Sequence, residues 1–316
     1  MIYLAEIIFM PRIAILDLGT NTFNLLIAEK DRQGNPVFIY SKELPVEIGK
    51  GGIHKREIIA EATERAIAAL HTHRQKMGEF NVDAHYAFAT SAVRDAENGK
   101  EFTRKMFIET GIEIKVLSGD EEAHWIYEGV KQASVLGSHH SLIMDIGGGS
   151  TEFIIGNERE ILWKKSYPLG VSRLYEIFYP ADPIISKKPE IEKHISAMLH
   201  DMFEVAKKLK PIELIGSSGS FDSFAEMLIR RTSSTEKAVN GYTYSLEEFD
   251  KLYNHLIIST VEERLQMPGL VQMRAPMFGY SAILTHLILK TLSLEKMRLS
   301  RYAMKEGIAK HLLAGL

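Results

Sequence analysis

Short apolar runs separated by turns occur near the start of the chain and again near its middle. They predict strands at Ile13–Leu16, Phe23–Ala28 and Val37–Tyr40, and then at Leu142–Met144, Glu152–Ile155 and Ile161–Trp163. After the first set, Arg56–Lys76 has apolar residues at helical spacing, and His85–Ala89 and Ile114–Leu117 are typical of strands. Two antiparallel meanders followed by alternating helices and strands indicate an α/β fold with mixed sheets.

The rest of the chain is mainly helical in its pattern. We expect helices at Pro189–Lys208, Leu246–Arg264 and Pro276–Lys290, and a strand at Glu213–Ile215. After that strand, Gly216-Ser217-Ser218-Gly219-Ser220 predicts a turn into a helix that begins at Phe221. Amide N–H groups in such a turn can bind a phosphate or a nucleoside, although this signal alone is weak.

The first bend of each meander carries small and hydroxyl-bearing residues between acidic ones. The segments are Asp17-Leu18-Gly19-Thr20-Asn21-Thr22 and Asp145-Ile146-Gly147-Gly148-Gly149-Ser150-Thr151-Glu152, and their first aspartates are 128 positions apart. Glycines allow a tight turn that offers consecutive N–H groups to an anion, while the carboxylates can hold a metal ion or a water. The repeat therefore predicts two related halves that face one cleft.

Two further segments carry candidate chemistry. Ser118 and Glu121 have the spacing of a helix capping box, which leaves the next residue, Glu122, free to enter the cleft as a general base. The alternative, which spacing alone favours, is that both glutamates only complement the helix dipole. Arg94, in Ala89–Asp95, can clamp a phosphate with two N–H groups or instead pair with Asp95 or another carboxylate.

Length and composition narrow these possibilities. A chain of 316 residues is long enough for two domains, and a net charge of −3 offers no general attraction to nucleic acid or to an anionic membrane. The absence of cysteine excludes thiolate metal sites and cysteine nucleophiles. No Walker P-loop or GxGxxG motif is present. Residues 1–10 are apolar but too short to span a bilayer, so we expect a leader or an over-called start, and a cytosolic protein.

Together, the loops at Asp17–Thr22 and Asp145–Glu152 and the motifs at Ala89–Asp95 and Ser118–Ala123 closely resemble the exopolyphosphatase and guanosine pentaphosphate phosphohydrolase family, in its short two-domain form. That family belongs to the actin, sugar kinase and heat-shock chaperone superfamily. The resemblance implies two actin-like (ribonuclease H-like) domains with mixed five-stranded sheets flanked by helices, and an active site in the interdomain cleft. We expect domain I at 11–130 plus about 299–316, and domain II at 131–298.

The resemblance also implies an activity and roles for particular residues. The activity is Mg²⁺-dependent removal of the terminal phosphate from inorganic polyphosphate or guanosine pentaphosphate. Glu122 matches the catalytic base, with Glu152 assisting, and Asp17, Asp145 and Glu152 match positions near the metal. The expected phosphate-binding residues are Gly19, Thr20, Asn21, Thr22, Arg94, Gly147, Gly148, Gly149, Ser150 and Ser217.

Several points stay open at this stage. The chain has Arg274-Ala275-Pro276 where many members have Arg-Ala-Asp, and Lys305-Glu306-Gly307 where they have Arg-Glu-Gly. Lys42, Lys164, Lys165 and Arg173 are candidates to line the approach of a polyanion, although solvation at the surface is the simpler interpretation. A superfamily kinase that uses ATP and a non-catalytic polyphosphate or guanosine tetraphosphate sensor are the alternative functions. The sequence leaves open whether the chain forms a homodimer.

Overall fold

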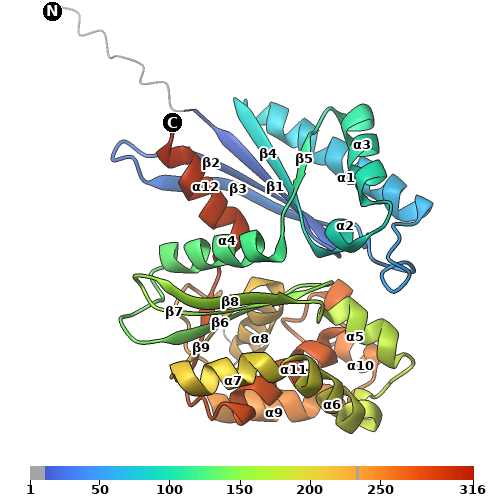
Figure 1. Cartoon of the computed structure of the whole chain (residues 1–316), viewed down its shortest axis with the longest axis vertical. Helices are drawn as coiled ribbons and strands as arrows, with labels where there is room; N and C mark the ends of the chain where they lie inside the picture. The colour runs from blue at the N-terminus through green and yellow to red at the C-terminus, as the bar shows by residue number, and fades with distance from the viewer. Residues whose placement is uncertain (1–10, 233–234) are drawn as a thin grey trace, which may run out of the picture.

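The computed structural model describes residues 11–232 and 235–316, and it shows two lobes, each built on a mixed five-stranded sheet (Figure 1). The predicted leader, residues 1–10, lies outside the described residues. The sheet orders are β3-β2-β1-β4-β5 and β10-β9-β6-β7-β8. In each sheet an antiparallel meander is followed by two parallel strands, so the two halves share one topology. The predicted fold class is confirmed.

The strands carry the apolar runs that the sequence pattern identifies. The first sheet contains β1 (Ile13–Leu18), β2 (Thr22–Lys30), β3 (Pro36–Pro45), β4 (Ala84–Ala89) and β5 (Ile114–Val116). The second contains β6 (Ser141–Ile146), β7 (Thr151–Gly156), β8 (Ile161–Tyr167), β9 (Leu214–Ser217) and β10 (Met297–Ser300). Since β6 and β7 are buried along their whole length, both faces of this sheet are covered.

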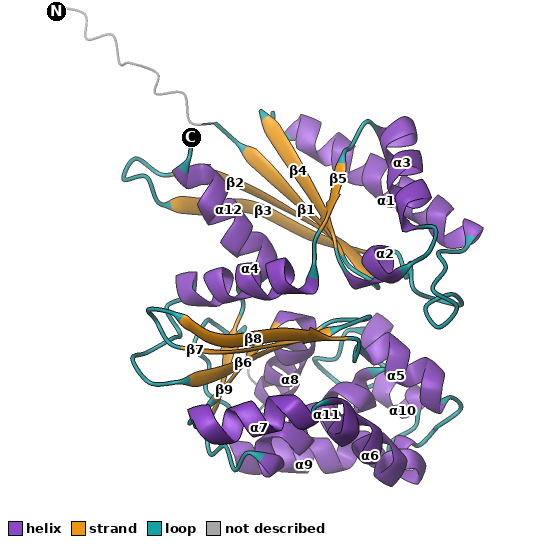
Figure 2. Ribbon diagram, in the orientation of Figure 1, coloured by secondary structure: helices purple, strands orange, loops and turns teal. Residues whose placement is uncertain are grey.

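Helices cover both faces of each sheet (Figure 2). Those that follow the first meander are α1 (Ala60–Glu79), α2 (Ser91–Asp95), α3 (Gly99–Thr110) and α4 (Gly119–Gln132). Those that follow the second are α5 (Val171–Phe178), η1 (Ile184–Lys187), α6 (Lys188–Met198), α7 (His200–Leu209), α8 (Ser218–Arg231), α9 (Leu246–Ile258), α10 (Val261–Leu265), η2 (Gln272–Arg274), α11 (Phe278–Thr291) and α12 (Met304–Ala314).

Two helices from distant parts of the chain, α4 and α12, lie between the sheets (Figure 1). Along β1, Ala14 and Leu16 join a core with α1 and α3, while Ile13 and Ile15 face the other way, toward α4 and α12. This alternation follows from the two-residue period of a strand. The core around α4 and α12 also includes Ile143 of β6, so one apolar cluster joins both lobes. The domain boundaries given above stay a prediction.

At three places the structure differs from the elements that the sequence pattern predicts. The helix predicted at Pro189–Lys208 is two helices, which meet at a buried Leu199 whose backbone leaves the helical region. The helix predicted at Leu246–Arg264 stops at Ile258, because Thr260 and Glu263 form a capping box that starts a new helix. The predicted turn at Gly216–Ser220 is absent: β9 passes directly into α8, which begins at Ser218 and not at Phe221, and Ser218 has a left-handed φ of 66°.

Glycines allow α12 to pack directly on α4. A Cβ built at Gly307 would lie 2.3 Å from the Trp125 carbonyl oxygen and 2.7 Å from the Gly129 nitrogen. We expect Gly307→Ala to lower the free energy of unfolding by about 1–3 kcal/mol, since the backbones must separate to admit the methyl group. Urea denaturation measures this change, with Gly78→Ala as the control, because a Cβ there meets no atom within 4 Å. Equal stability of the two variants would contradict the packing argument.

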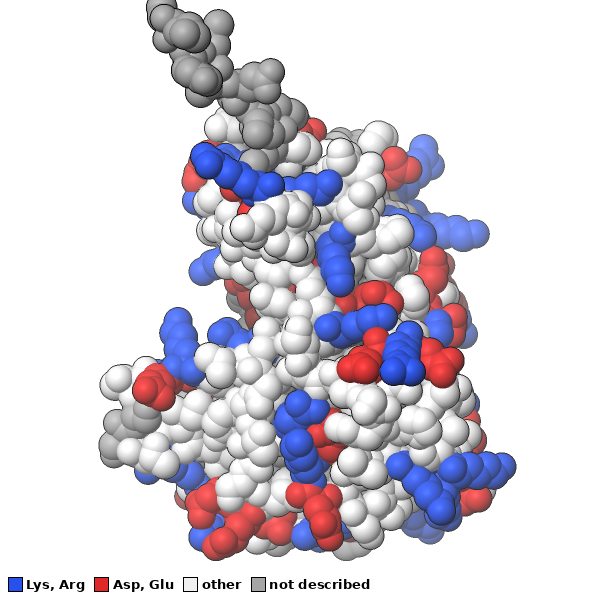
Figure 3. Space-filling view, turned by 90° about the vertical axis from the view of Figure 1, so that its left-hand side faces the viewer, with Lys and Arg blue, Asp and Glu red and all other residues white. Residues whose placement is uncertain are grey.

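The surface carries both signs of charge. On the face shown in Figure 3, basic and acidic side chains are interspersed. Two of the candidate approach residues are already paired, because Lys164 and Lys165 each lie 2.6 Å from an aspartate, Asp120 and Asp201 respectively. Within the part of the chain that the structure describes, no helix is both long and apolar enough to cross a membrane.

Candidate active site

The two predicted loops are tight hairpins closed by the same hydrogen bond. The Gly19 N–H donates to the Thr22 carbonyl at 3.0 Å, and the Gly147 N–H donates to the Ser150 carbonyl at 3.0 Å. The first hairpin joins β1 to β2 and the second joins β6 to β7, so each stands at the same position in its sheet. Two glycine amides expected to face an anion are therefore used inside the hairpins.

Neighbouring segments bind the carbonyl groups of both hairpins. In the second, Val171 N–H donates to the Gly147 carbonyl at 3.0 Å, and Ser172 N–H donates to the Gly148 carbonyl at 2.8 Å. In the first, the Thr20 and Asn21 carbonyls accept from the backbone of residues 46–49. Within residues 11–232 and 235–316, no acceptor takes the amides of Gly148, Gly149 and Ser150 or of Thr20 and Asn21. These amides are available to an anion.

The hairpins meet across the boundary between the lobes. A Cβ at Gly148 would lie 2.8 Å from Asn21 Nδ2, and one at Gly149 would lie 2.6 Å from Ser91 Oγ. Ser172 Oγ also donates to Asn21 Oδ1 at 2.8 Å. A Cβ at Gly148 or Gly149 would be too close to the opposite lobe, so these two glycines serve close packing between the lobes as well as the turn itself.

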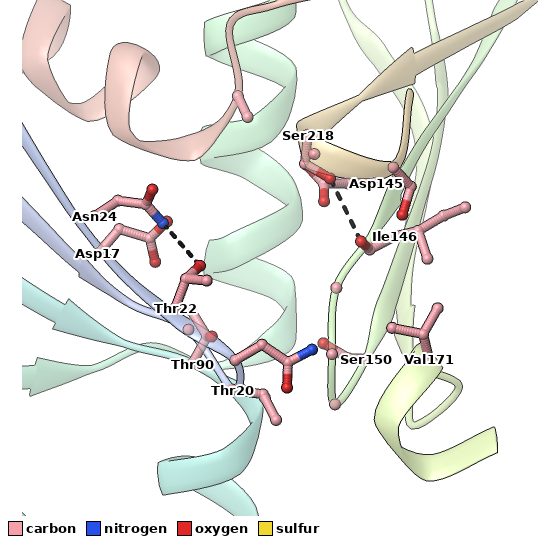
Figure 4. Close-up of a pocket in the computed structure, with 18 of the residues that line it drawn as sticks. Asp17, Thr20, Thr22, Asn24, Thr90, Asp145, Ile146, Ser150, Val171 and Ser218 are labelled. Atoms are coloured by element: carbon pink, nitrogen blue, oxygen red, sulfur yellow. Dashed lines mark hydrogen bonds between the residues drawn. The ribbon is translucent and has the colours of Figure 1, made fainter. Parts of the chain in front are cut away.

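A cavity of about 230 Å³ lies between the lobes, and most of the predicted site residues line it. In Figure 4, Asp17 and Asp145 reach toward it from opposite sheets. The predicted residues that line it are Asp17, Gly19, Thr20, Asn21, Thr22, Glu122, Asp145, Gly147, Gly148, Gly149, Ser150 and Glu152. The structure thus brings both loops and the candidate base together.

Two predicted phosphate ligands do not line this cavity. Arg94 Nη1 donates to Glu122 Oε2 at 2.8 Å and to the Leu117 carbonyl at 3.2 Å, so it forms the ion pair considered as its alternative role. Ser217 is fully buried and donates from Oγ to Asp145 Oδ2 at 2.6 Å. Each side chain therefore lies behind a cavity carboxylate and binds it.

Glu121 and Glu122 have different surroundings, although they are adjacent. Glu121 forms the predicted capping box with Ser118 and contacts Lys115. The hydrogen bond from the Ser118 N–H, followed by the one from Lys115, lowers the pKa of Glu121 to about 2. Glu122 points into the cavity with only 10% of its side chain exposed. Burial and then the charge of Glu152 raise its pKa well above the usual value, against the effect of Arg94.

The other cavity carboxylates are also perturbed. Burial, opposed by Lys305 and reinforced by Asp145, raises the pKa of Asp17 to about 7. Burial and the Asp145 charge likewise raise the pKa of Glu152, which accepts from Ser166 Oγ at 2.7 Å. Burial raises the pKa of Asp145 despite its bond to Ser217. Several acidic groups that line one cleft favour a cation beside them.

Asp17, Asp145 and Glu152 are the cavity carboxylates that could take part in holding a divalent cation. Among the described residues, no group of three or more His, Cys, Asp and Glu side chains could hold a metal ion by itself. Mg²⁺ commonly uses one or two protein carboxylates and completes its octahedron with water and phosphate oxygens. Asp145, with Asp17 or Glu152, meets that smaller requirement.

The cavity has a further charged end that sequence reasoning missed. Each of its cations pairs with a carboxylate: Arg274 NH2 lies 3.1 Å from Glu43 Oε1, Arg301 Nε lies 3.5 Å from Asp222 Oδ1, and Lys305 Nζ lies 3.1 Å from Glu306 Oε1. The only sequence signals were the motifs at Arg274 and Lys305 that depart from the family pattern. Nothing local marks Glu43 or Asp222, which lie in ordinary strand and helix segments.

Comparisons with known proteins show which family and fold the chain shares. The family model described as "Ppx/GppA phosphatase family" matches residues 26–314. An exopolyphosphatase of known structure from Cytophaga hutchinsonii is 37% identical, with a TM-score of 0.93 over 96% of this chain and 98% of that one. Exopolyphosphatase 1 of Mycobacterium tuberculosis is 26% identical over 306 residues, 94% of this chain and 87% of that protein.

A family member of known structure from Aquifex aeolicus shares the fold at 21% identity, with a TM-score of 0.79 over 97% of this chain and 99% of that one. The family model covers most of both lobes and begins within β2, so the first hairpin precedes the matched residues. The chain belongs to the Ppx/GppA phosphatase family.

Proposed function

We propose that this protein is a phosphohydrolase that releases the terminal phosphate of inorganic polyphosphate, with guanosine pentaphosphate as the second candidate substrate. The observation that carries the proposal is the position of Glu122, a buried carboxylate that faces a cleft between two hairpins with available amides. The similarity to named exopolyphosphatases supports the choice of polyphosphate.

In the proposed reaction, the terminal phosphate lies between the hairpins. The amides of Gly148, Gly149 and Ser150 bind its oxygens from one lobe, and those of Thr20 and Asn21 bind from the other. Mg²⁺, when bound, offsets charge on the phosphate oxygens beside Asp145 and Glu152. Such fixed donors suit phosphoryl transfer, which depends mainly on positioning and charge stabilisation.

Glu122 is proposed to orient and deprotonate the attacking water. A new bond forms between the water oxygen and the terminal phosphorus, while the bond to the bridging oxygen breaks. The proton goes to Glu122, the electron pair of the broken bond stays on the shortened chain, and orthophosphate is released. Arg94 holds the base by its 2.8 Å contact, and Ser217 holds Asp145. A raised pKa makes a carboxylate a better base near neutral pH, provided that it is ionised.

The substrate is identified by measuring phosphate release with Mg²⁺ from tripolyphosphate, long-chain polyphosphate and guanosine pentaphosphate, in parallel. The proposal expects release from at least one polyphosphate. Release from guanosine pentaphosphate alone would select the second candidate. ATP consumption that requires a sugar or acid would indicate a kinase, and tight binding without release would indicate a sensor.

Metal dependence should vary with pH in a defined direction. We expect EDTA to abolish phosphate release, and the Mg²⁺ concentration for half-maximal activity to rise below about pH 7, where Asp17 holds a proton. Metal binding requires ionised carboxylates, so protons and Mg²⁺ compete for them. Magnesium titrations at several pH values measure this effect, and Asp17→Asn should weaken it, with Glu152 supplying the remainder. The same half-maximal concentration throughout would contradict the assignment.

A further inference from the structure

The first turn of α5 binds all three glycine carbonyls of the second hairpin. Val171 and Ser172 use their backbone N–H groups, and Arg173 completes the series with a side-chain bond from Nε to the Gly149 carbonyl at 2.7 Å. The Arg173 side chain is only 13% exposed, so the expectation that it is solvated at the surface is wrong. Its guanidinium is part of the framework beneath the hairpin.

The same guanidinium crosses to the other lobe. Its NH2 group donates to Asp95 Oδ2 at 2.6 Å, at the end of α2. Asp95 also accepts from Ser91 Oγ at 3.2 Å and lies 3.5 Å from Arg94 Nε. Arg94 in turn holds Glu122. An unbroken series of polar contacts therefore runs from the Gly149 carbonyl through Arg173, Asp95 and Arg94 to the candidate base.

We propose that Arg173 is a positioning residue, which fixes the phosphate hairpin of one lobe relative to the base held by the other. The role rests on the proposed function, because it concerns the distance from Glu122 to a phosphate on the hairpin. Arginine suits it because a planar guanidinium offers separate N–H groups to two acceptors in a fixed geometry, whereas a lysine ammonium on a flexible stem does not.

The kinetic test compares Arg173→Met and Arg173→Lys with the wild type in polyphosphate hydrolysis. We expect kcat to fall roughly 10- to 100-fold with little change in KM, because the substrate ligands remain while the base loses alignment. Lysine should recover only part of this loss. Asp95→Asn should lower kcat similarly, and the double variant Asp95→Asn/Arg173→Met should lose little more than either single one. A rise in KM without a fall in kcat, or additive losses, would overturn the proposal.

A matched control is available beside the same contact. Arg56 donates from Nε to the main-chain carbonyl of Asp95 at 3.1 Å, and not to its carboxylate. Arg56→Met therefore removes a neighbouring arginine without interrupting the series, and we expect an unchanged kcat. An equal loss in this variant would show that any change near Asp95 disturbs the site, and would overturn the specific role of Arg173.

A second readout does not depend on turnover. In ¹⁵N-arginine NMR spectra, Arg173→Met should shift or broaden the side-chain Nε–H signal of Arg94, which Arg94→Lys identifies, while Arg56→Met should leave it unchanged. Arg173 and Arg94 contact the two oxygens of the same Asp95 carboxylate, so an unmoved signal in the Arg173→Met protein overturns the inference. Absence of phosphate release from the wild type would instead contradict the proposed function, with the NMR result still deciding the coupling.

Discussion

Glu122→Gln should lower kcat for phosphate release by about 10²- to 10⁴-fold, the usual contribution of a general base, with little change in KM. Glutamine keeps the shape of the side chain and can still accept from Arg94, but it cannot take a proton from water. Initial rates over a range of polyphosphate concentrations separate the two parameters. The variant should unfold at nearly the wild-type temperature, because its amide carries less desolvation cost than a buried carboxylate.

Glu121→Gln is the matched control for this experiment. The two glutamates are adjacent on α4, yet Glu121 caps the helix outside the cavity. Its replacement should cost about 1 kcal/mol of stability at most and leave kcat unchanged. If Glu122→Gln retained wild-type kcat, or if both variants lost the same activity, Glu122 would not be the base. The second result would point to distortion of α4 instead.

Asp145→Asn should weaken activation by Mg²⁺ and lower kcat/KM by more than about 10²-fold at limiting metal, a larger loss than removal of a residue that only orients a ligand. The charge of Asp145 raises the pKa of both Asp17 and Glu152, so it acts on both of the neighbouring acidic groups. A neutral amide removes the charge that makes a divalent cation favourable there. Magnesium titrations at a fixed polyphosphate concentration well below KM measure the shift.

Ser217→Ala should weaken Mg²⁺ binding less than Asp145→Asn does. Its hydroxyl binds Asp145 behind the cavity, so its loss should cost about 10- to 100-fold in apparent Mg²⁺ affinity. If Ser217 instead bound phosphate, as the sequence suggested, KM for polyphosphate would rise at saturating metal. Wild-type magnesium activation in Asp145→Asn would exclude Asp145 from the metal site.

The local features of the site could be predicted from the sequence because each is written within a few residues. Glycines and hydroxyls between strands specify the hairpins, and Ser118 with Glu121 specifies the start of the helix that carries Glu122, although the spacing alone did not favour an inward Glu122. The mixed sheets follow from the repeated meanders. These features depend on backbone chemistry and periodicity, which short segments determine.

Contacts between distant segments could not be predicted in this way. Arg173 and Asp95 are 78 positions apart, and Arg274 and Glu43 are 231 apart, so no local pattern joins them. A single sequence gives no sign of which charges the lobes bring together. The left-handed backbone at Ser218 could not be predicted either, since a positive φ is uncommon for serine and its amino-acid type does not reveal it.

The position of water attack tests the central claim most directly. Tripolyphosphate hydrolysed by the wild-type protein in ¹⁸O-enriched water, with mass spectrometry of both products, shows which phosphorus receives the oxygen. The account predicts one solvent oxygen in the released orthophosphate, none in the pyrophosphate, and loss of the reaction in Glu122→Gln. Solvent oxygen in the pyrophosphate, or transfer of the phosphate to a sugar, an acid or a nucleotide instead of water, would contradict it.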